Sequence, residues 1–462
     1  MTEVEQEQFK LPKGWAETGI GDICDLINGR AFKPSEWAPA GVPIIRIQNL
    51  NDHEAKFNYC NFEVEEKYLV DNGQLLFAWS GTPETSFGAH VWNRGKAILN
   101  QHIFKVNINE DCLDKTFLKH LLNRNVKEYI GKAHGTAGLA HITKGKFENS
   151  RILLPPFNEQ GRITSKVEAL FSFLDVGVES LRKVRAQLKH YRQAVLKYAF
   201  EGKLTEEWRK THRDQLEPAT RILEQISQEK AVESNLPELP EGWVCTRLEL
   251  ITTNHDGKRV PVSRKKRESM KGVYSYYGAS GIIDSVDNYL FDGNFLLIGE
   301  DGANLLARAT PIAFQATGKF WVNNHAHVLT PLGGIPISYL EHYINRISLT
   351  EYITGTAQPK LTQRAMNKIP VPLAPFKEQF KIAEEISRRF SVIDEISKEI
   401  ELMIKYSDKL RHSILKTAFE GKLIPQDPND EPAEKLLERI KTERFNRKSK
   451  FHNQLELSTY VK

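Results

Sequence analysis

Two long stretches of this chain carry an apolar side chain at nearly every seventh position and again three positions further on. The sevens are occupied by Val167, Leu174, Leu181, Leu188 and Val195, and in the second stretch by Ile386, Ile393, Ile400, Ser407 and Ile414. The positions three residues further on include Leu170, Val184, Tyr191, Ile396, Met403 and Leu410. This spacing predicts two long helices, each with a coiled-coil seam.

Proline and glycine mark the limits of both stretches. Pro156 and Pro375 stand just before them, and Gly202 and Gly421 stand just beyond them as C-caps. Each predicted helix has roughly 43 residues and a length of about 65 Å.

An exposed apolar stripe would leave either helix unstable in water, so we expect the two helices to pack together as an antiparallel coiled coil. That pair would act as a rigid spacer with one domain at each end, related by a pseudo-twofold axis. The alternative is that the helices dimerise with another copy of the chain. Internal pairing is favoured because the tether gives it a high effective concentration.

The chain also contains an internal duplication. Residues 192–204 read RQAVLKYAFEGKL and residues 411–423 read RHSILKTAFEGKL, an offset of 219 positions. The same offset relates PPFNEQGRI to APFKEQFKI at the two helix starts, whereas LPKGW at Leu11 and LPEGW at Leu239 are 228 positions apart. EPATRILEQI and EPAEKLLERI, beyond the helices, are 214 positions apart. The matching blocks enclose stretches whose sequences differ between the two repeats. This pattern indicates two domains with the same role and different targets.

The duplication divides the chain into two parallel sets of segments. Each set has a variable domain, a long helix and a shorter tail with a helix. The predicted limits are 1–155, 156–202 and 203–236 for the first set, and 237–374, 375–421 and 422–462 for the second.

Both variable domains are expected to be built mainly from short strands. The first contains PIIRIQNL, QLLFAW, AHVW, HIFKV and RILLP, with a helix near residues 117–132. The second repeats the order with YSYYGASGIID, NFLLIG, KFWVNNHAHVLTP and the helical ISYLEHYINRI. These runs, punctuated by Gly, Asn and Pro, predict α/β domains with mixed or antiparallel sheets, within a chain that is α+β as a whole.

Composition agrees with a folded protein of more than one domain. The 462 residues exceed one ordinary core, and 40% are hydrophobic and 27% charged. The net charge of +5 permits nucleic-acid binding without requiring it. Four cysteines without CxxC spacing and an acidic, polar beginning suggest reduced thiols and a cytoplasmic location.

Several turns after strands carry amide, basic and hydroxyl side chains. Arg, Asn and Gln can form paired hydrogen bonds with base edges, while Lys and hydroxyl groups favour phosphates. The alternative for any one of these turns is a solvated loop. The candidate DNA contacts in the first domain are Arg46, Gln48, Asn49, Trp79, Ser80, Thr82, Asn100, Gln101, His102, Thr136, His141 and Lys144. Those in the second are Arg264, Lys265, Tyr276, Tyr277, Ser280, Asp301, Asn304, Asn324, His325, Gln358 and Lys360.

Two features of the second domain leave alternatives open. The basic run from Arg264 to Arg267 is either a phosphate clamp or a solvated loop. His325 and His327 alternate on a predicted strand, so that one should face inward and one outward, and no metal site is expected there.

In the order of its motifs the chain resembles the specificity subunits of type I restriction-modification systems. The resemblance covers nearly the whole length, through LPKGW and LPEGW, GQLLFAWSGT, YYGASGIID, the two helix starts, both AFEGKL helix ends and DPNDEPAEKLLERIKTER. It implies that each variable domain reads one half of a split, asymmetric double-stranded DNA target and that the helices set the spacing.

The same resemblance implies partners and places the chemistry in them. Two modification subunits would bind S-adenosylmethionine and methylate adenine, and two restriction subunits would use ATP and Mg²⁺ to translocate and cut DNA. This chain would then bind no cofactor and no metal and would have no catalytic residues.

Missing motifs agree with a non-catalytic chain. The sequence has no Asn-Pro-Pro-aromatic motif, no GxxxxGKS/T loop and no convincing nuclease cluster, and Glu300-Asp301 beside a glycine is typical of a turn. A self-contained modifying and cutting enzyme is therefore disfavoured. A second rival is a coiled-coil scaffold whose sheet domains bind proteins instead of DNA.

Overall fold

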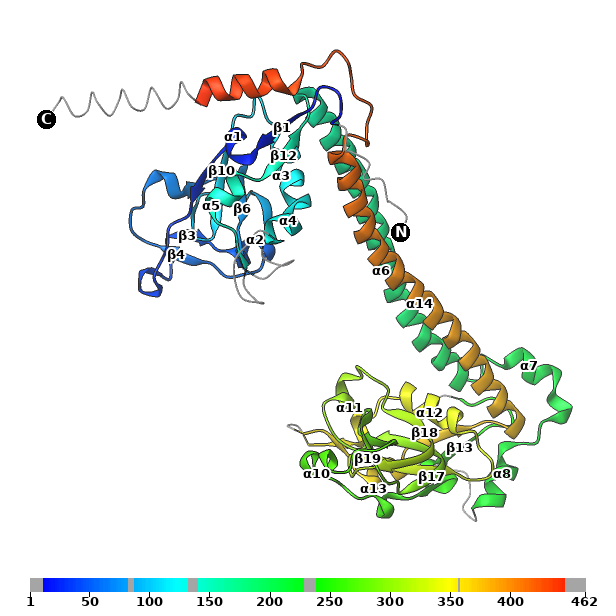
Figure 1. Cartoon of the computed structure of the whole chain (residues 1–462). Helices are drawn as coiled ribbons and strands as arrows, with labels where there is room; N and C mark the ends of the chain where they lie inside the picture. Colours follow the sequence, from blue (N-terminus) through cyan, green and yellow to red (C-terminus); the bar gives the residue numbers. More distant parts are fainter. Residues whose placement is uncertain (1–10, 82–86, 132–139, 228–237, 356–357, 445–462) are drawn as a thin grey trace, which may run out of the picture. The chain divides into compact units, whose positions relative to one another are not determined.

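The computed structural model describes residues 11–444 except 82–86, 132–139, 228–237 and 356–357. The chain forms two compact units. Unit 1 comprises Met1–Ser180 and Met403–Lys462, and unit 2 comprises Leu181–Leu402. Each unit therefore holds one variable domain together with a segment of each long helix (Figure 1).

Unit 1 is built around two four-stranded sheets. The first is antiparallel, in the order β2 (Cys24–Asn28), β10 (Ile103–Ile108), β6 (Gln74–Ala78) and β8 (Gly88–Trp92). The second has the order β4 (Asn58–Cys60), β3 (Val42–Ile45), β9 (Ala97–Leu99) and β5 (Leu69–Val70), with β3 and β9 parallel. Two antiparallel pairs join β1 (Ala16–Gly19) to β12 (Arg151–Leu154), and β7 (Ser80–Gly81) to β11 (Ala140–His141).

Short helices complete unit 1. Helix α3 packs against β8, and Asp114 caps it by accepting a hydrogen bond from the Phe117 N–H. The helices are α1 (Ile20–Ile23), α2 (Ile47–Asn51), α3 (Lys115–Arg124), α4 (Val126–Gly131) and α5 (Lys144–Glu148).

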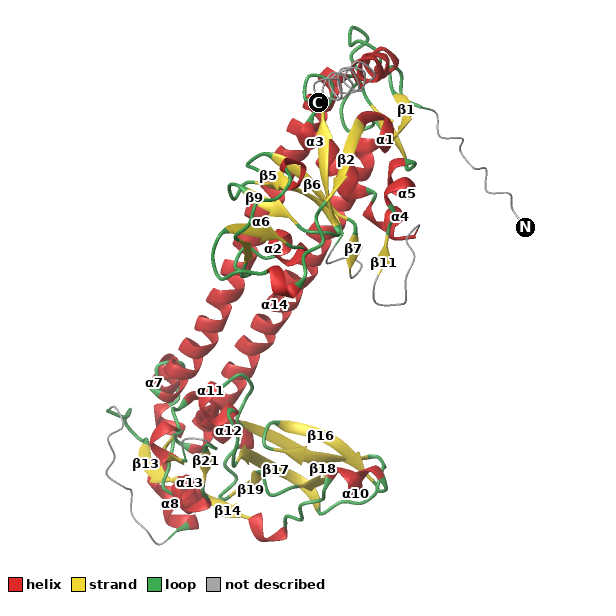
Figure 2. Ribbon diagram, turned by 90° about the vertical axis from the view of Figure 1, so that its left-hand side faces the viewer, coloured by secondary structure: helices red, strands yellow, loops and turns green. Residues whose placement is uncertain are grey.

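Unit 2 has one six-stranded mixed sheet (Figure 2). Its order is β14 (Thr252–Asn254), β19 (Ala326–Pro331), β17 (Phe291–Gly299), β18 (Ala313–Val322), β15 (Tyr274–Gly278) and β16 (Gly281–Val286). The two-stranded pairs are β13 (Val244–Arg247) with β22 (Pro370–Leu373), and β20 (Ile353–Thr354) with β21 (Lys360–Leu361). The short helices are α7 (Glu206–Thr211), α8 (Ala219–Ile226), α9 (Leu248–Ile251), α10 (Arg264–Glu268), α11 (Asn304–Ala307), α12 (Ile337–Arg346) and α13 (Gln363–Asn367).

The two variable domains share one frame. The order β2-β10-β6-β8 of unit 1 corresponds to β14-β19-β17-β18 of unit 2. Strand β18 pairs with β17 and, in parallel, with β15, whereas in unit 1 these roles are divided between β8 and β9. The predicted fold class, α+β with mixed and antiparallel sheets, is confirmed.

The two long helices are α6 (Phe157–Phe200) and α14 (Phe376–Phe419), each of 44 residues. Both begin directly after the predicted prolines. Both end just before the predicted glycines, Gly202 and Gly421, whose φ angles of 69° and 68° allow the left-handed C-cap. Among the described residues, no helix is both long and apolar enough to cross a bilayer.

Within each unit, segments of α6 and α14 contact each other through the same three residue types. In unit 1, Arg411 pairs with Asp175 and stacks 4.9 Å from the Phe171 ring centroid. In unit 2, Arg192 pairs with Asp394 and stacks 4.2 Å from the Phe390 ring centroid. Each residue of the first set has its repeat equivalent in the second, with the helices exchanged.

The structure changes the predicted seam in one respect. At the ten positions spaced by seven residues, nine side chains are apolar and at least half-buried, as expected. At the positions three residues further on, however, five side chains are 36% to 53% exposed: Val184, Tyr191, Ile396, Met403 and Leu410. The positions four residues after each seventh are half-buried or buried instead, except Arg185, and they include the Phe171, Arg192, Phe390 and Arg411 of the stacked pairs. The guanidinium groups of Arg411 and Arg192 lie over the Phe171 and Phe390 rings, so the contact face includes the position next to the predicted one.

In each unit, a tail helix and an LPxGW segment meet at the start of a long helix; the tail helix is α8 in unit 2 and residues 433–444 in unit 1. In unit 2, the Ala219 N–H donates to the Gly242 carbonyl, and the Trp243 indole donates to Glu378 at 3.0 Å. In unit 1, the equivalent Ala433 N–H donates to Gly14, and Trp15 donates to Glu159 at 3.1 Å. The matching sequence blocks therefore form the fixed frame that carries each variable domain.

Candidate nucleic-acid interface

Three segments of unit 1 converge where β6 and β7 end. Trp79 accepts a hydrogen bond from the Ile142 N–H and donates its own N–H to the His102 carbonyl. The Ser80 hydroxyl lies 2.5 Å from Nδ1 of His141 across the β7–β11 pair. The pairing brings together predicted contacts from three separate loops: Trp79, Ser80, Asn100, Gln101, His102 and His141.

Aromatic rings make up the centre of this unit 1 site. Trp79 stacks on Phe104 with ring centroids 5.5 Å apart, and it meets His102 edge-on at 5.1 Å. His102 and His141 lie 6.0 Å apart, and the Trp79 indole donates to the Asn28 side chain at 3.1 Å. The site is therefore rich in rings and amides and contains no carboxylate among these residues.

His102 is held in an unusual state. Its φ of 75° lies in the left-handed region, which a residue with a side chain rarely occupies. Within the described part of the chain, its Nδ1 is buried without a hydrogen-bond partner, as are the Asn100 Oδ1 and one terminal nitrogen of Arg30. Burial, helped by the nearby His141, lowers the pKa of His102, which keeps the ring neutral at pH 7. Backbone strain and unpaired polar atoms gathered in one place are typical of functional sites.

The other predicted contacts of unit 1 lie elsewhere. Asn49 is buried, and its side chain holds the α2 turn by accepting from the Arg46 N–H and donating to Ala55. Arg46 lies over Trp37, Gln48 is exposed, and Lys144 is exposed beside Glu148. Thr82 and Thr136 fall outside the described residues.

Unit 2 builds the equivalent site from charged residues. The Glu300 N–H donates to the His325 carbonyl at 2.8 Å, and Asp301 forms a backbone bridge with Lys360. His325 Nδ1 lies 2.7 Å from the Asp301 carboxylate, and Lys360 Nζ lies 3.1 Å from the Glu300 carboxylate. The same frame that presents rings in unit 1 thus presents ion pairs in unit 2.

A buried ion network supports the Glu300–Asp301 turn. His327 is 1% exposed, with Nδ1 2.6 Å from the Asp256 carboxylate and Nε2 2.8 Å from the Leu361 carbonyl. Both ring nitrogens of His327 therefore face oxygen atoms, one of a carboxylate and one of a backbone carbonyl. Arg259 lies 2.7 Å from Glu300 and 3.3 Å from Asp256.

These pairings fill the places that a metal ion would need. Asp256, Glu300 and His327 offer ligand atoms within 4.8 Å of one another. Each carboxylate, however, already faces a cation, and both ring nitrogens of His327 are committed. His325 is about half-exposed while His327 is buried, which confirms the predicted alternation.

The remaining predicted contacts of unit 2 differ in exposure. Tyr276 is buried and its hydroxyl accepts from the Val262 N–H at 3.0 Å, so it is part of the core. Tyr277 stacks on Phe314, and the Asn304 side chain holds Thr310 in a local turn. The exposed members are Arg264, Lys265, Ser280, Asn324 and Gln358.

Sequence reasoning missed three residues of these sites. Asn28 reaches the unit 1 site through the pairing of β2 with β10, and Arg30 reaches it through a bridge with Asn100. Arg259 reaches Glu300 across a loop. No local motif marks any of them. Arg267, taken as part of the basic run, instead pairs with Asp284 at 2.8 Å.

The sequence matches a known domain in both repeats. A sequence model described as the type I restriction modification DNA specificity domain covers residues 12–189 and again 240–406. The chain belongs to this specificity family. Its division into two matches agrees with the duplication found in the sequence.

Relatives in the specificity family match almost end to end. The chain is 25% identical to the type I restriction enzyme EcoDI specificity subunit of Escherichia coli over 454 residues, covering 94% of this chain and 96% of that subunit. It is also 25% identical to the EcoBI specificity subunit of Escherichia coli over 472 residues, covering 94% of each.

Solved structures show the same fold. A chain from a structure described as the basis of complex assembly and conformational transition of the type I R-M system has a TM-score of 0.62 at 18% identity, covering 90% of this chain and 100% of that one. The HsdS subunit of Thermoanaerobacter tengcongensis has a TM-score of 0.51 at 18% identity, covering 90% and 99%.

Proposed function

We propose that this chain selects a split, asymmetric DNA target, with one variable domain reading each half. The observation that carries the proposal is that one structural frame presents two different sets of side chains. Trp79, His102 and His141 in unit 1 stand where Glu300, His325 and Lys360 stand in unit 2. Two readers of one design but different chemistry suit two unlike half-sites.

The unit 1 site suits contacts with base edges. Asn100 and Gln101 can pair with adenine, and neutral His102 can donate one hydrogen bond and accept another. The buried, unpaired polar atoms of Asn100, His102 and Arg30 would gain partners when a base or an ordered water enters.

The unit 2 site combines acceptors with fixed positive charge. The Asp301 carboxylate can accept a hydrogen bond from the cytosine amino group, while Lys360 can contact a guanine edge or a phosphate. The exposed Arg264 and Lys265 on α10 would contact phosphates and position the domain without reading sequence.

In the proposed complex, the long helices set the spacing between the two recognition domains and provide a docking surface for partner subunits. The exposed apolar side chains of α6 and α14, among them Phe173, Met403 and Tyr406, support docking of protein partners. Those partners would be two modification subunits, which hold S-adenosylmethionine and methylate adenine, and two restriction subunits, which use ATP and Mg²⁺. This chain would supply specificity and no catalysis. Residues 1–155 and 237–374 are the proposed recognition domains.

A footprinting experiment tests the proposal. The purified chain, mixed with its modification subunit, is expected to protect two short DNA stretches separated by an unprotected spacer. His102→Ala should weaken protection of one stretch and His325→Ala that of the other, because each residue lies in a different reader. A single protected stretch, or loss of both stretches in either variant, would contradict the proposal.

A further inference from the structure

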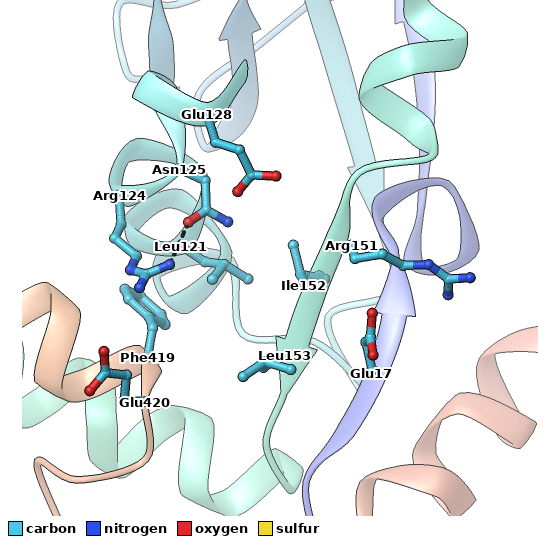
Figure 3. Close-up of a pocket in the computed structure, with 10 residues that line it drawn as sticks. All are labelled: Glu17, Leu121, Arg124, Asn125, Glu128, Arg151, Ile152, Leu153, Phe419 and Glu420. Carbon is cyan, nitrogen blue, oxygen red and sulfur yellow. Dashed lines mark hydrogen bonds between the residues drawn. The ribbon is translucent and has the colours of Figure 1, made fainter. Parts of the chain in front are cut away.

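Among the strands of the described residues, β12 of unit 1 pairs only with β1, which leaves its other edge without a strand. The bond from the Ile20 N–H to the Ser150 carbonyl fixes which peptide groups face β1. By the alternation of antiparallel pairs, the peptide groups of Arg151 and Leu153 face away from β1. Arg151 and Leu153 are among the residues that line a cavity of about 260 Å³ (Figure 3).

Unit 2 fills the equivalent place with its own side chains. There the outward carbonyls belong to Pro370 and Pro372 of β22, and they accept hydrogen bonds from the hydroxyls of Tyr343 and Tyr339, each at 2.5 Å. Proline has no N–H, so this edge is fully satisfied. An uncovered strand edge is a feature that proteins usually mask, and unit 2 masks it.

The helices that carry these side chains are equivalent. FLKHLLNR in α3 aligns with YLEHYINR in α12, which places Phe117 opposite Tyr339 and Leu121 opposite Tyr343. In both units the asparagine two residues after this position clamps a neighbouring strand, Asn123 on Ala89 and Asn345 on Ala313. The first repeat thus keeps the helix in place but lacks both phenol groups.

The cavity suits an aromatic ring with a polar tip. In Figure 3, Leu121, Ile152, Leu153 and Phe419 surround its centre, whereas charged side chains lie around them. The charged residues of its wall are Glu17, Arg124, Glu128, Arg151 and Glu420. Apolar walls beside carbonyls that have no partner within the described part of the chain match a tyrosine better than an ion or a fully apolar group.

We propose that this cavity receives a tyrosine side chain from a modification subunit. The ring would pack on Leu121 and Leu153, and its hydroxyl would donate to the Arg151 carbonyl, as Tyr343 donates to Pro370 in unit 2. Tyrosine is among the residues most enriched at interface centres, where one side chain can dominate binding. The inference rests on the proposed function, because that function supplies the partner.

The proposal makes the two partner copies unequal. The cavity is open in unit 1, while Tyr343 closes its equivalent in unit 2. Only one of the two modification subunits could therefore insert a tyrosine. Its binding should depend on the cavity, and the binding of the other copy should not.

Leu121→Tyr tests this directly, because it copies Tyr343 and closes the cavity from within. Titration of the full chain with the modification subunit, followed by sedimentation, should show one binding step weakened on the order of 10- to 30-fold and the other unchanged. Tyr343→Phe is the matched control: it keeps the unit 2 place filled and should leave both steps unchanged. Thermal unfolding of Leu121→Tyr alone checks that it folds.

A second measurement needs no filled cavity. A photoreactive benzoyl-phenylalanine in place of Glu128, at the cavity wall, should cross-link to a segment of the modification subunit that contains a tyrosine. Cross-linking only to residues 445–462 of this chain, or to nothing, would overturn the proposal. If Leu121→Tyr bound both copies of the modification subunit as tightly as the wild-type chain does, this proposal would be overturned and the proposed function would stand. Failure of the wild-type chain to bind any modification subunit would overturn both.

Discussion

The buried carboxylate at the start of each long helix allows a matched stability test. Glu378 is fully buried and accepts hydrogen bonds from Thr205 at 2.7 Å, Arg209 at 2.7 Å and Trp243 at 3.0 Å. Burial raises the pKa of Glu378, although these three partners oppose the rise. Its repeat equivalent in unit 1 is Glu159.

Glu159 has a milder set of partners. It accepts from the Trp15 indole at 3.1 Å and from the Gln426 amide at 3.4 Å, and no cation is hydrogen-bonded to it among the described residues. Burial also raises the pKa of Glu159. The two sites therefore share the tryptophan and differ in whether a charged group would be left behind.

That difference sets the expected magnitudes. Glu378→Ala leaves the largely buried Arg209 without its counter-charge, and breaking such a pair from one side costs about 3–5 kcal/mol. Glu159→Ala leaves only neutral donors unsatisfied, which costs about 1–3 kcal/mol. Glu378→Gln retains an acceptor oxygen and should fall between the two values.

Hydrogen exchange is the suitable assay because it reports each unit separately. Protection of α12 amides follows unit 2, and protection of α3 amides follows unit 1. Glu378→Ala should lower the opening free energy of α12 and leave α3 unchanged, and Glu159→Ala should do the reverse with a smaller loss. Equal losses in the two variants, or a loss below about 1 kcal/mol for Glu378→Ala, would refute the reasoning.

Three further predictions concern separate features. Burial, with a smaller contribution from Arg192, lowers the pKa of His342 to about 4. Below about pH 6.5 the unfolded chain therefore binds a proton that the folded chain does not, and the free energy of unfolding of unit 2 should fall by up to about 3 kcal/mol as the pH drops towards 4. Urea unfolding of His342→Gln should show a weaker dependence on pH. A Cβ on Gly29 would lie 2.0 Å from the Asn100 carbonyl oxygen, so Gly29→Ala should weaken the affinity for one half-site on the order of tenfold. Gly145→Ala is the control, because its Cβ meets nothing within 4 Å and its affinity should be unchanged. Normal footprints of both variants would refute this prediction. A double-mutant cycle of Arg192 and Asp394 should give a coupling of about 0.5–1 kcal/mol that shrinks with salt, and a salt-independent value would contradict the ion pair.

Periodicity predicted the long helices because one period governs their whole length. The sevenths at Val167 and Ile386 are buried, as the spacing requires. The flanking position at Tyr191 is exposed instead, because apolarity alone does not reveal that the next residue, Arg192, stacks on Phe390 and takes its place in the contact face.

The sequence identified single turns with suitable side chains, but it did not show which of these turns lie together in one site. Ser80, His102 and His141 each stood out after a strand, but only strand pairing brings them together. Asn49 and Tyr276 looked equally suitable in sequence, yet both are buried and hold local structure. Which polar residue turns inward depends on register, and register depends on contacts between distant segments.

The central claim is that two unlike readers in one chain choose the two halves of a DNA target. Mapping methylated adenines across a genome tests it most directly, in a host that carries either this chain or a hybrid whose residues 16–150 come from a relative. The account predicts a split methylated motif that disappears without the chain and changes in one half only with the hybrid. A motif that is unchanged, or altered in both halves, would contradict it.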